Sequence, residues 1–427
     1  MFLANDILTF IGIPGDKISN ISSHTENNNI FVYIDLKDER GICPYCKSSN
    51  IGIKDYYTAH INNSIIKYKM MKVQIRVRRY ICRNCNKSFK QNYGLSSPGN
   101  TISYEVKTKI IEDLKSELTF KQISDTYNVS PSTVSRIFDQ HVFYQKRLEL
   151  TEIICVDEFC YKHGDILGKY PFVITDPLTN NIIDIVISRR KEVLIEYFNK
   201  IKITEKNNVQ FFVSDMHETY RIIKKIFFKN AIHIVDKFHI VRAFNDAITS
   251  IRTRIIKNEI WDNKEYRFLK KNWKIFLAKR DKLNNIKKVD RYGVVRTLID
   301  DLDDCLDKYP DLYYAYWTKE DFIKKINTAM YYYDAEKFVN SFETRMLSSE
   351  IKEIRKVGNT FKNWNKEIIN ALSRNKYNFK INNAIAEATN NKIRKLINCC
   401  YGLPNFERMR KRVLNINRNK PKEKATK

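Results

Sequence analysis

The sequence predicts a multidomain α/β protein, and three observations support this fold class. At 427 residues the chain is too long for one ordinary hydrophobic core, so roughly two to four folded units are expected. The middle of the chain alternates short apolar runs with amphipathic segments, the pattern of strands and helices in an α/β fold. Near the N-terminus, two pairs of evenly spaced cysteines indicate a separate metal-stabilised unit.

Residues 1–98 are expected to contain a zinc ribbon. Each cysteine pair has the two-residue spacing that presents both thiolates to one zinc ion; the four ligands are Cys43, Cys46, Cys82 and Cys85. Between the pairs, apolar and mostly basic residues alternate as in a half-buried strand: Met71, Lys72, Val73, Gln74, Ile75, Arg76, Val77 and Arg78. Four thiolates close the tetrahedral shell, so the zinc is expected to be structural and its removal to unfold residues 43–90.

Residues 99–148 are expected to form a helix-turn-helix DNA-binding domain. Helical patterns cover residues 104–114, 119–127 and 130–138. Ser130 is a good N-cap for the last helix, and Pro131 suits its first position. The expected core residues are Ile123, Val129, Val134 and Ile137. The side chains left to face the major groove are Ser132, Thr133 and Arg136. Two short helices joined by a turn also occur as plain scaffold, but the basic context favours DNA binding.

From residue 149 to 244 the order of elements predicts a ribonuclease H-like domain. Three strand patterns come first, separated by turns of hairpin length, at residues 153–159, 170–175 and 182–188. Helices at 192–201 and 218–228 then alternate with strands at 210–214 and 232–235. Three antiparallel strands followed by a β-α-β-α-β succession with parallel strands match that fold.

Three acidic residues are the candidate catalytic and metal-binding groups. Asp157 lies at the end of the first strand, Asp215 follows the strand that ends at residue 214, and Glu387 lies in a helix predicted over residues 382–396. In a ribonuclease H-like sheet these two strands can be neighbours, so the aspartates are expected to meet although they are 58 positions apart. A divalent cation needs several anionic oxygens, and a phosphate backbone needs the cation. The acids therefore indicate metal-dependent phosphoryl transfer on nucleic acid.

Two further regions complete the predicted organisation. Residues 245–370 contain all four tryptophans and are expected to be an α-helical insertion. Residues 371–427 are expected to hold the catalytic helix and a basic C-terminal tail. On that helix, Glu387 shares a face with Asn391 and Arg394, which we expect to contact DNA. The tail is expected to contact phosphate or to be a solvated end; its cations are Arg410, Lys411, Arg412, Arg418, Lys420, Lys422 and Lys424.

The net charge narrows the class of partner. The chain has 76 Lys plus Arg against 49 Asp plus Glu, a net charge of +27, together with 43% hydrophobic residues. This balance is typical of a folded protein that binds a polyanion. No apolar run is long enough for a membrane span, and the N-terminus lacks the basic region of a secretion signal. We therefore expect a cytoplasmic protein without a membrane partner.

Taken together, these segments resemble the DDE transposases of bacterial insertion sequences, specifically the ISL-three family. Besides the cysteine pairs and the helix-turn-helix, the matching segments are Val156-Asp157-Glu158, Ser214-Asp215-Met216, Val235-Asp236-Lys237-Phe238-His239, Glu387 with Asn390-Asn391-Lys392-Ile393, and Tyr401-Gly402-Leu403-Pro404-Asn405-Phe406. The family's catalytic acids map onto Asp157, Asp215 and Glu387. The chain has Ala388 where the family usually has glycine. The resemblance implies a transposase that acts on the inverted-repeat ends of its own element.

This resemblance leads to a hypothesis for the chemistry. Asp157 is expected to bridge two Mg²⁺ (or Mn²⁺) ions about 4 Å apart, with Asp215 completing one site and Glu387 the other. Asp236 and His239 are held as auxiliary metal or DNA contacts. Glu158 should face the opposite side of its strand and be structural. The partners are double-stranded DNA, at element ends and target, and a second copy of the chain in a synaptic complex.

Two alternatives share these residues. In one, the protein is a DNA-binding regulator whose catalytic fold is inactive. The presence of an acid at all three catalytic positions argues against such a loss of activity. In the other, it is a metal-dependent DNA nuclease without strand transfer. The sequence does not separate cleavage alone from cleavage followed by strand transfer, because the same acids serve both.

Overall fold

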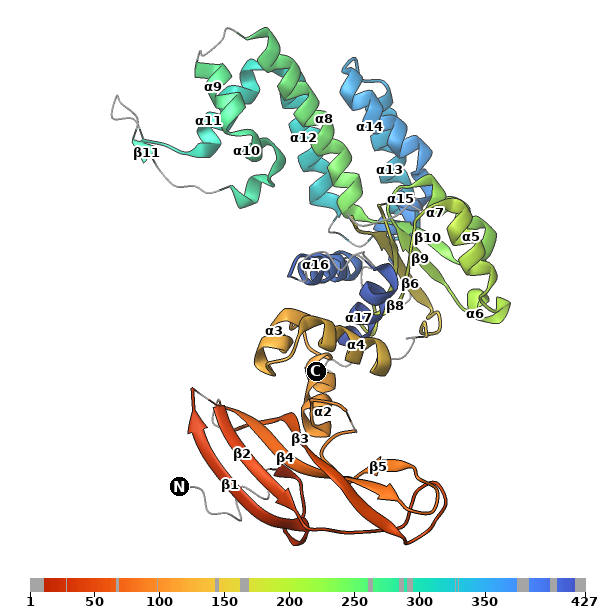
Figure 1. Cartoon of the computed structure of the whole chain (residues 1–427). Helices are drawn as coiled ribbons and strands as arrows, with labels where there is room; N and C mark the ends of the chain where they lie inside the picture. Colours follow the sequence, from red (N-terminus) through yellow and green to blue (C-terminus); the bar gives the residue numbers. More distant parts are fainter. Residues whose placement is uncertain are drawn as a thin grey trace. The chain divides into compact units, whose positions relative to one another are not determined.

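The computed structural model shows a mixed α/β chain that divides into two compact units. It describes residues 11–27, 29–66, 69–97, 99–142, 146–161, 169–259, 264–283, 288–289, 295–326, 328, 330–374, 384–399 and 405–418. Unit 1 consists of residues 1–146 and 396–427, and unit 2 of residues 147–395. Each unit contains a five-stranded sheet and several helices (Figure 1). Within the described residues, no helix is both long and apolar enough to cross a bilayer.

Unit 1 begins with a mixed sheet, drawn from red to orange in Figure 1. Its elements are η1 (Gly15–Lys17), β1 (Ile18–Glu26), β2 (Asn29–Leu36), β3 (Ile51–Ile66), β4 (Lys69–Cys82) and β5 (Ser88–Lys90). The strand order is β1-β2-β4-β3, and β5 pairs with β4. Strands β2 and β4 are parallel, whereas the other pairs are antiparallel.

Strand β4 forms the middle of this sheet because its alternating sequence gives it one apolar face. The predicted inward residues are buried: Met71, Val73, Ile75 and Val77. They share a core with residues of β2, β3 and the segments 11–13 and 93–95, and none of the four paired cysteines belongs to that core. The sheet is therefore larger than the small antiparallel sheet expected of a zinc ribbon, because β1 and β2 extend it.

Three helices follow: α2 (Tyr104–Asp113), α3 (Phe120–Thr126) and α4 (Pro131–His141). As predicted, the Ser130 side chain caps α4 by accepting the Thr133 N–H, and Pro131 occupies its first turn. Helix α3 begins with a capping box between Thr119 and Gln122. The expected core residues Ile123, Val134 and Ile137 are buried, and Val129 packs against them half-buried.

The C-terminal helix α17 (Phe406–Arg418) belongs to unit 1 and packs against these three helices. Arg412 is fully buried, and its guanidinium donates to the main-chain carbonyls of Leu114, Ser116 and Leu118. These carbonyls follow the end of α2, where helical carbonyls lack partners and attract a cation. Arg410 is also buried. The expectation that the tail's cations contact phosphate is therefore wrong for Arg410 and Arg412; Lys420, Lys422 and Lys424 lie outside the described residues.

Unit 2 is organised around a second sheet. Its strands are β6 (Ile153–Glu158), β7 (Phe172–Asp176), β8 (Asn181–Val186), β9 (Phe211–Ser214) and β10 (Ile232–Val235). The order is β10-β9-β6-β7-β8. Strands β6, β7 and β8 pair antiparallel, whereas β9 runs parallel to both β6 and β10. The pairing confirms the predicted succession of three antiparallel strands followed by parallel ones.

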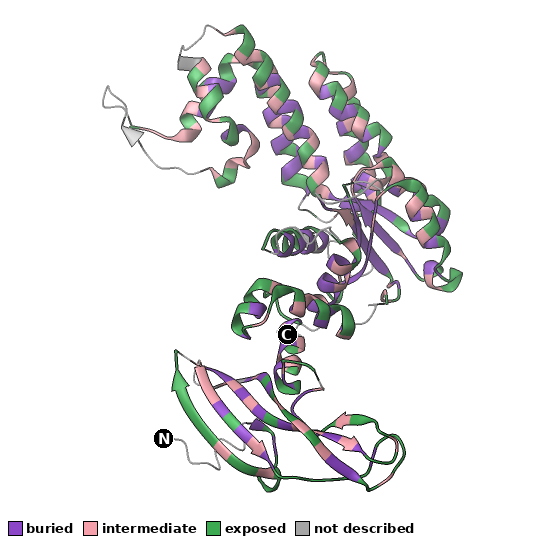
Figure 2. Cartoon of the chain, viewed as in Figure 1, coloured by how far each residue is buried: buried purple, intermediate pink, exposed green. Residues whose placement is uncertain are grey.

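Helices cover both faces of this sheet, since its strands are apolar on both sides. Alternate residues of β6 enter different cores: Ile154 and Val156 pack in one with Phe212, and Ile153 and Cys155 in the other. The first core is closed by α5 (Lys191–Asn199) and α7 (Glu218–Phe227), with α6 (Ile203–Asn207) between them in sequence. The strands are the most continuously buried elements of the unit (Figure 2).

The second core joins the sheet to the region predicted as a helical insertion. Its helices are α8 (Lys237–Asn258), α9 (Lys264–Lys271), α10 (Trp273–Leu277), α11 (Leu298–Lys308), α12 (Pro310–Ile326), α13 (Tyr332–Leu347), α14 (Lys352–Asn363) and α15 (Asn365–Leu372). The turn η2 (Arg280–Lys282) and the short antiparallel strands β11 (Lys288–Val289) and β12 (Val295–Arg296) interrupt the helices. Helix α16 (Ala384–Cys399) follows, and its Ala386 enters the same core.

Candidate active site

The parallel pairing of β6 and β9 brings two carboxylates together. Cys155 pairs with Val213, so two residues further along both strands Asp157 lies beside Asp215. Asp157, Glu158 and Asp215 each contribute an oxygen to a group in which these atoms lie within 4.8 Å of one another. The structure thus places two of the three predicted catalytic acids in one cluster; their catalytic role stays a prediction.

The cluster strongly perturbs Asp157. Its burial, together with the nearby charge of Asp215, raises the pKa of Asp157 to about 7. The Oδ1 atom accepts the Glu158 main-chain N–H at 2.8 Å, and Oδ2 accepts Asn390 Nδ2 at 2.7 Å. Each oxygen keeps a second lone pair for a cation. Adjacent carboxylates that repel each other at low exposure suit a divalent cation, which offsets that repulsion.

His239 and Asp236 lie on the other side of Asp215. Asp236 follows β10 and caps α8 by accepting the Phe238 N–H at 3.3 Å. His239 Nε2 lies 3.0 Å from Asp215 Oδ2, and Nδ1 lies 3.5 Å from Asp236 Oδ2. Burial alone would lower the pKa of His239, but the two carboxylates outweigh it and raise the pKa to about 10. A protonated ring therefore neutralises this pair, and the three side chains form a second possible metal-binding group.

Glu158 does not simply face away from the cluster, as strand alternation suggested. It is the last residue of β6, and one of its oxygens lies within the group formed with Asp157 and Asp215. A long side chain at a strand end can turn around the edge of the sheet. Its two oxygens are nevertheless held by Arg189 and by the hydroxyl of Tyr220. These bonds compensate its charge within the protein, which is consistent with a structural role.

Glu387, the third predicted acid, is placed differently. It lies in the first turn of α16, is exposed, and belongs to neither carboxylate group among the described residues. Asn390, one turn further along, is 1% exposed and donates both to Asp157 Oδ2 and to the main-chain oxygen of Glu158, at 3.1 Å. Helix α16 therefore contacts Asp157 through Asn390, whereas the Glu387 carboxylate does not join the two aspartates in this structure.

The predicted DNA-contacting residues are found at two places. On α16, Asn391 and Arg394 are exposed, and Arg394 donates to the Asn391 side-chain oxygen at 3.1 Å. On α4 in unit 1, Ser132 and Arg136 are exposed, whereas Thr133 is half-buried. Their accessibility is compatible with DNA contacts, which stay a prediction.

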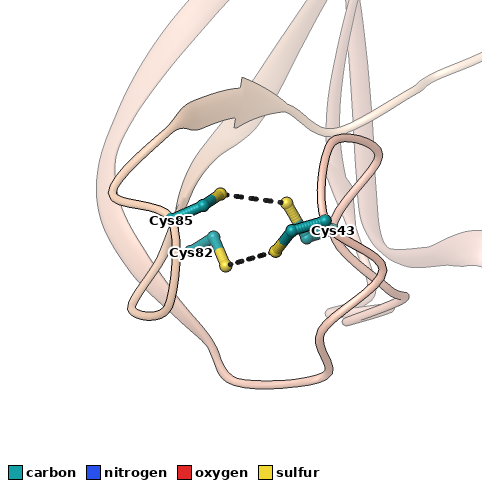
Figure 3. A group of neighbouring side chains, drawn as sticks. Cys43, Cys82 and Cys85 are labelled. Carbon is teal, nitrogen blue, oxygen red and sulfur yellow. Dashed lines mark hydrogen bonds between the residues drawn. The ribbon is translucent and has the colours of Figure 1, made fainter.

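The four predicted zinc ligands converge in unit 1 (Figure 3). Cys43 Sγ lies 3.7 Å from Cys85 Sγ, and Cys46 Sγ lies 3.5 Å from Cys82 Sγ. Tetrahedral zinc with bonds of about 2.3 Å requires sulfur atoms about 3.8 Å apart, so the cluster fits this ion. The main-chain N–H of Cys85 lowers the pKa of the Cys82 thiol to about 6, which favours the thiolate that zinc needs.

Of three further residues that shape the site, the sequence places only Asn390 there, on the polar helix face that carries Glu387. Asn390 shares a helix face with Glu387 at a spacing of three, and this periodicity was a usable signal for a residue at the site. Arg189 and Tyr220, which hold Glu158, come from the segment before α5 and from α7. Nothing in their local sequence indicates the contact, because it depends on how β6 is packed.

An α/β sheet whose adjacent parallel strands end in a half-buried carboxylate cluster defines a class of protein with a candidate divalent-metal site. A family model described as a transposase, of the ISL-three group of DDE enzymes, matches residues 154–413, more than half of the chain. The chain therefore belongs to the ISL-three family of transposases and is a DNA-cleaving enzyme. No curated protein is similar enough to match it.

Proposed function

We propose that this transposase binds the terminal inverted repeats of its own insertion sequence and catalyses metal-dependent strand cleavage followed by strand transfer. The observation that carries the proposal is the adjacency of Asp157 and Asp215 at the ends of β6 and β9. We assign unit 2 to the ribonuclease H-like fold on its strand order, with the helices from α8 to α15 as an insertion before α16.

In this proposal Asp157 and Asp215 hold Mg²⁺ or Mn²⁺, and Glu387 completes the ligand set from α16. The metal ions supply activation of a water or a DNA 3′-hydroxyl and stabilisation of the leaving oxygen. Asn390 orients Asp157, and Glu158 stays with Arg189 and Tyr220. Because the pKa of Asp157 is raised to about 7 without metal, this carboxyl must lose a proton when it becomes a ligand.

DNA recognition is assigned to two surfaces. Helices α3 and α4 are proposed as the helix-turn-helix that reads the repeat, with Ser132, Thr133 and Arg136 toward the major groove. Asn391 and Arg394 are proposed to contact phosphate beside the acids. Zinc held by the four cysteines stabilises unit 1. Synapsis of two ends requires at least two copies of the chain, acting in the cytoplasm on the nucleoid.

The decisive experiment combines purified protein, Mg²⁺, labelled element ends and a target plasmid. Joined products are expected; cleavage without joining would indicate a nuclease, and binding alone a regulator. Asp157→Ala, Asp215→Ala and Glu387→Ala should each abolish cleavage while retaining end binding, since they remove metal ligands and not the recognition helix. Retained cleavage in one variant would remove that residue from the catalytic set. Arg136→Ala should weaken binding to the repeat at fixed salt by about 1–3 kcal/mol.

A further inference from the structure

Within the described part of unit 1, one face of the sheet carries side chains that are exposed or half-buried, and the proposed reaction does not use it. The segments 11–13 and 93–95 cover its apolar face. On the opposite face, the strand registers place aromatic and basic side chains in neighbouring rows: His24 of β1 pairs with Phe31 of β2, Phe31 with Lys72 of β4, Tyr33 with Gln74, and Tyr56 of β3 with Arg78. The aromatic-basic face is defined here by His24, Phe31, Tyr33, Tyr56, Lys72 and Arg76.

Aromatic rings on this face are arranged as accessible surfaces. The His24 ring stacks at 5.1 Å on Phe31 and at 5.6 Å on Tyr33, with interplanar angles of 12° and 13°. His24 is exposed, and Tyr33 and Tyr56 are 40% and 43% exposed. Flat rings at the surface of a sheet offer their π-faces to another planar group.

Cations lie among these rings. The Arg76 guanidinium lies 4.4 Å from the centre of the Tyr56 ring, and Lys72 Nζ lies 5.5 Å from that of Phe31. Within the described part of the chain, neither Lys72 nor Arg76 forms an ion pair with a carboxylate. Their positive charges are thus available to a polyanion, although Asp35 is the register neighbour of Arg76.

We propose that the aromatic-basic face binds single-stranded DNA. Duplex DNA keeps the faces of its bases stacked on one another, so it could use the cations but not the rings. An unpaired strand offers both phosphates and free base faces, and base–aromatic stacking beside cations is how sheet surfaces hold single strands. The face therefore fits unpaired DNA better than the duplex proposed for α3 and α4, and this inference is independent of the proposed reaction.

A stabilising role within the protein is the alternative that the test must separate. Cation–π pairs contribute about 0.5–1 kcal/mol at exposed sites, so the rings could serve the sheet alone. In that case their removal would lower the melting temperature of unit 1 without changing the affinity for DNA. A ligand-binding role instead predicts a weaker affinity for the single strand, whatever the change in melting temperature, because the His24 ring also stacks on Phe31 and Tyr33 within the sheet.

The experiment measures fluorescence anisotropy of the full-length protein with labelled oligothymidylate about 20 nucleotides long and with a duplex of the same length, at fixed salt and without Mg²⁺. The double variant His24→Ala/Tyr33→Ala is expected to bind the single strand at least about fivefold more weakly and the duplex with unchanged affinity. Tyr33→Phe should retain binding, because it keeps the ring. Tyr333→Ala, which removes a ring that is 71% exposed on α13, is the matched control and should change neither affinity.

Three outcomes would overturn the inference. They are unchanged affinity of the double variant for the single strand, an equal loss for single strand and duplex, and a changed oligomeric state with no effect on the single strand, which would identify an interface between copies. Failure to cleave element ends would overturn the proposed function and leave this inference standing, because the binding assay contains no metal and no repeat sequence.

Discussion

At the scale of single residues, the candidate site brings together carboxylates that repel each other when no cation is bound. Asp157 lies half-buried beside Asp215, and the charge of Asp215 is in turn neutralised by His239, 3.0 Å from its Oδ2 atom. In the metal-free site Asp157 therefore binds a proton only as the pH falls below about 7, whereas the His239 ring stays protonated up to about pH 10. Metal affinity should consequently increase with pH, since the ligands must be deprotonated.

The raised pKa of Asp157 predicts a pH-dependent stability in the absence of metal. The folded pKa is about 7 against 3.8 for the free side chain, so between these values the folded protein binds the extra proton. The free energy of unfolding then falls as pH rises from about 4 to about 7. Above pH 7 the folded state carries the full destabilisation from the ionised Asp157. Asp157→Asn removes the charge and should stabilise unit 2 by about 2–4 kcal/mol near pH 8, with little effect near pH 4.

All four tryptophans lie within unit 2, so urea unfolding followed by tryptophan fluorescence reports on that unit alone. The two pH values should be compared for wild type and for Asp157→Asn, without divalent metal. Glu152→Gln, an acid before the start of the same strand, is a control for general loss of negative charge. An equal stabilisation at both pH values would show that Asp157 is not the group responsible.

Asn390 gives a second prediction at this scale. Its amide nitrogen donates both to Asp157 and to the main chain of Glu158, so it orients a carboxylate that we propose as a metal ligand. Residues that orient metal ligands typically contribute 10- to 100-fold to metal affinity. Asn390→Ala should raise the Mg²⁺ concentration for half-maximal cleavage by about this factor and leave binding of the element ends intact.

The control for Asn390 is Lys395→Ala, an exposed position on the same helix. It should leave the Mg²⁺ requirement unchanged. If Asn390→Ala instead lowered cleavage equally at all Mg²⁺ concentrations, the asparagine would act on the helix or the DNA and not through Asp157.

At the scale of elements, the sheet of unit 1 has a hydrophobic core of its own, so a bound zinc ion would stabilise only the region around the cysteines. Cys43, Cys82 and Cys85 belong to a small cluster with Ile51 and Tyr80, whereas the main core of the sheet lies elsewhere in β2, β3 and β4. Removal of zinc should therefore release the ends of β3 and β4 and the two cysteine turns, and leave the rest of the sheet folded. This is a smaller effect than the unfolding of residues 43–90 expected from the sequence.

Hydrogen exchange with and without a zinc chelator measures this prediction. Amides of residues 43–51 and 82–90 should lose protection, while those of residues 71–77 keep it. Cys82→Ser should reproduce the effect of the chelator, and Cys305→Ser, a buried thiol in unit 2, should not. Loss of protection across the whole sheet would mean that the zinc cluster and the sheet fold together.

Helices and strands with a clear local sequence signal could be predicted. Elements that exist only through pairing or packing with another part of the chain could not. The strands of unit 2 follow from short apolar runs bounded by turns, and the cap of α4 follows from Ser130 before Pro131. Strand β1 was not predicted, because almost all its residues are polar and exposed and it exists through pairing with β2. The buried Arg412 was read as a surface cation, since nothing local shows that α17 packs on α2.

The same distinction applies to the candidate site. The aspartates could be predicted because each follows an apolar strand, and the parallel register then makes them neighbours. The position of Glu387 relative to them could not, because it depends on the packing of a helix that begins at residue 384. The ion pair of Glu158 with Arg189 and its hydrogen bond from the Tyr220 hydroxyl likewise depend on how unit 2 is packed.

At the scale of the whole molecule, the chain returns to its first unit after completing the second. Unit 1 is made from residues 1–146 and 396–427, so α17 completes a helical group whose other members come nearly 300 residues earlier. The helices α2 to α4 of unit 1, proposed to bind DNA, and the carboxylate unit are therefore joined by two chain segments, one after α4 and one within α16. Helix α17 is consequently part of the folded unit 1.

Truncation tests this organisation. A chain that ends after residue 404 lacks α17, so the carbonyls of Leu114, Ser116 and Leu118 lose Arg412, and Phe120 loses the guanidinium that lies 5.5 Å from its ring centre. Unsatisfied buried carbonyls cost about 1–3 kcal/mol each, so residues 104–141 should lose their protection from hydrogen exchange. Tryptophan fluorescence should show unit 2 unfolding as in the full chain.

A chain that ends after residue 418 is the matched control, because it keeps α17 and removes Lys420, Lys422 and Lys424. It should retain full protection in α2, α3 and α4. If these lysines contact phosphate, its DNA affinity should depend less steeply on salt, by a slope of up to about 3. Should the shorter chain instead keep protected helices and bind the repeat normally, α17 would be dispensable for the fold of unit 1, and the burial of Arg412 would carry no stability.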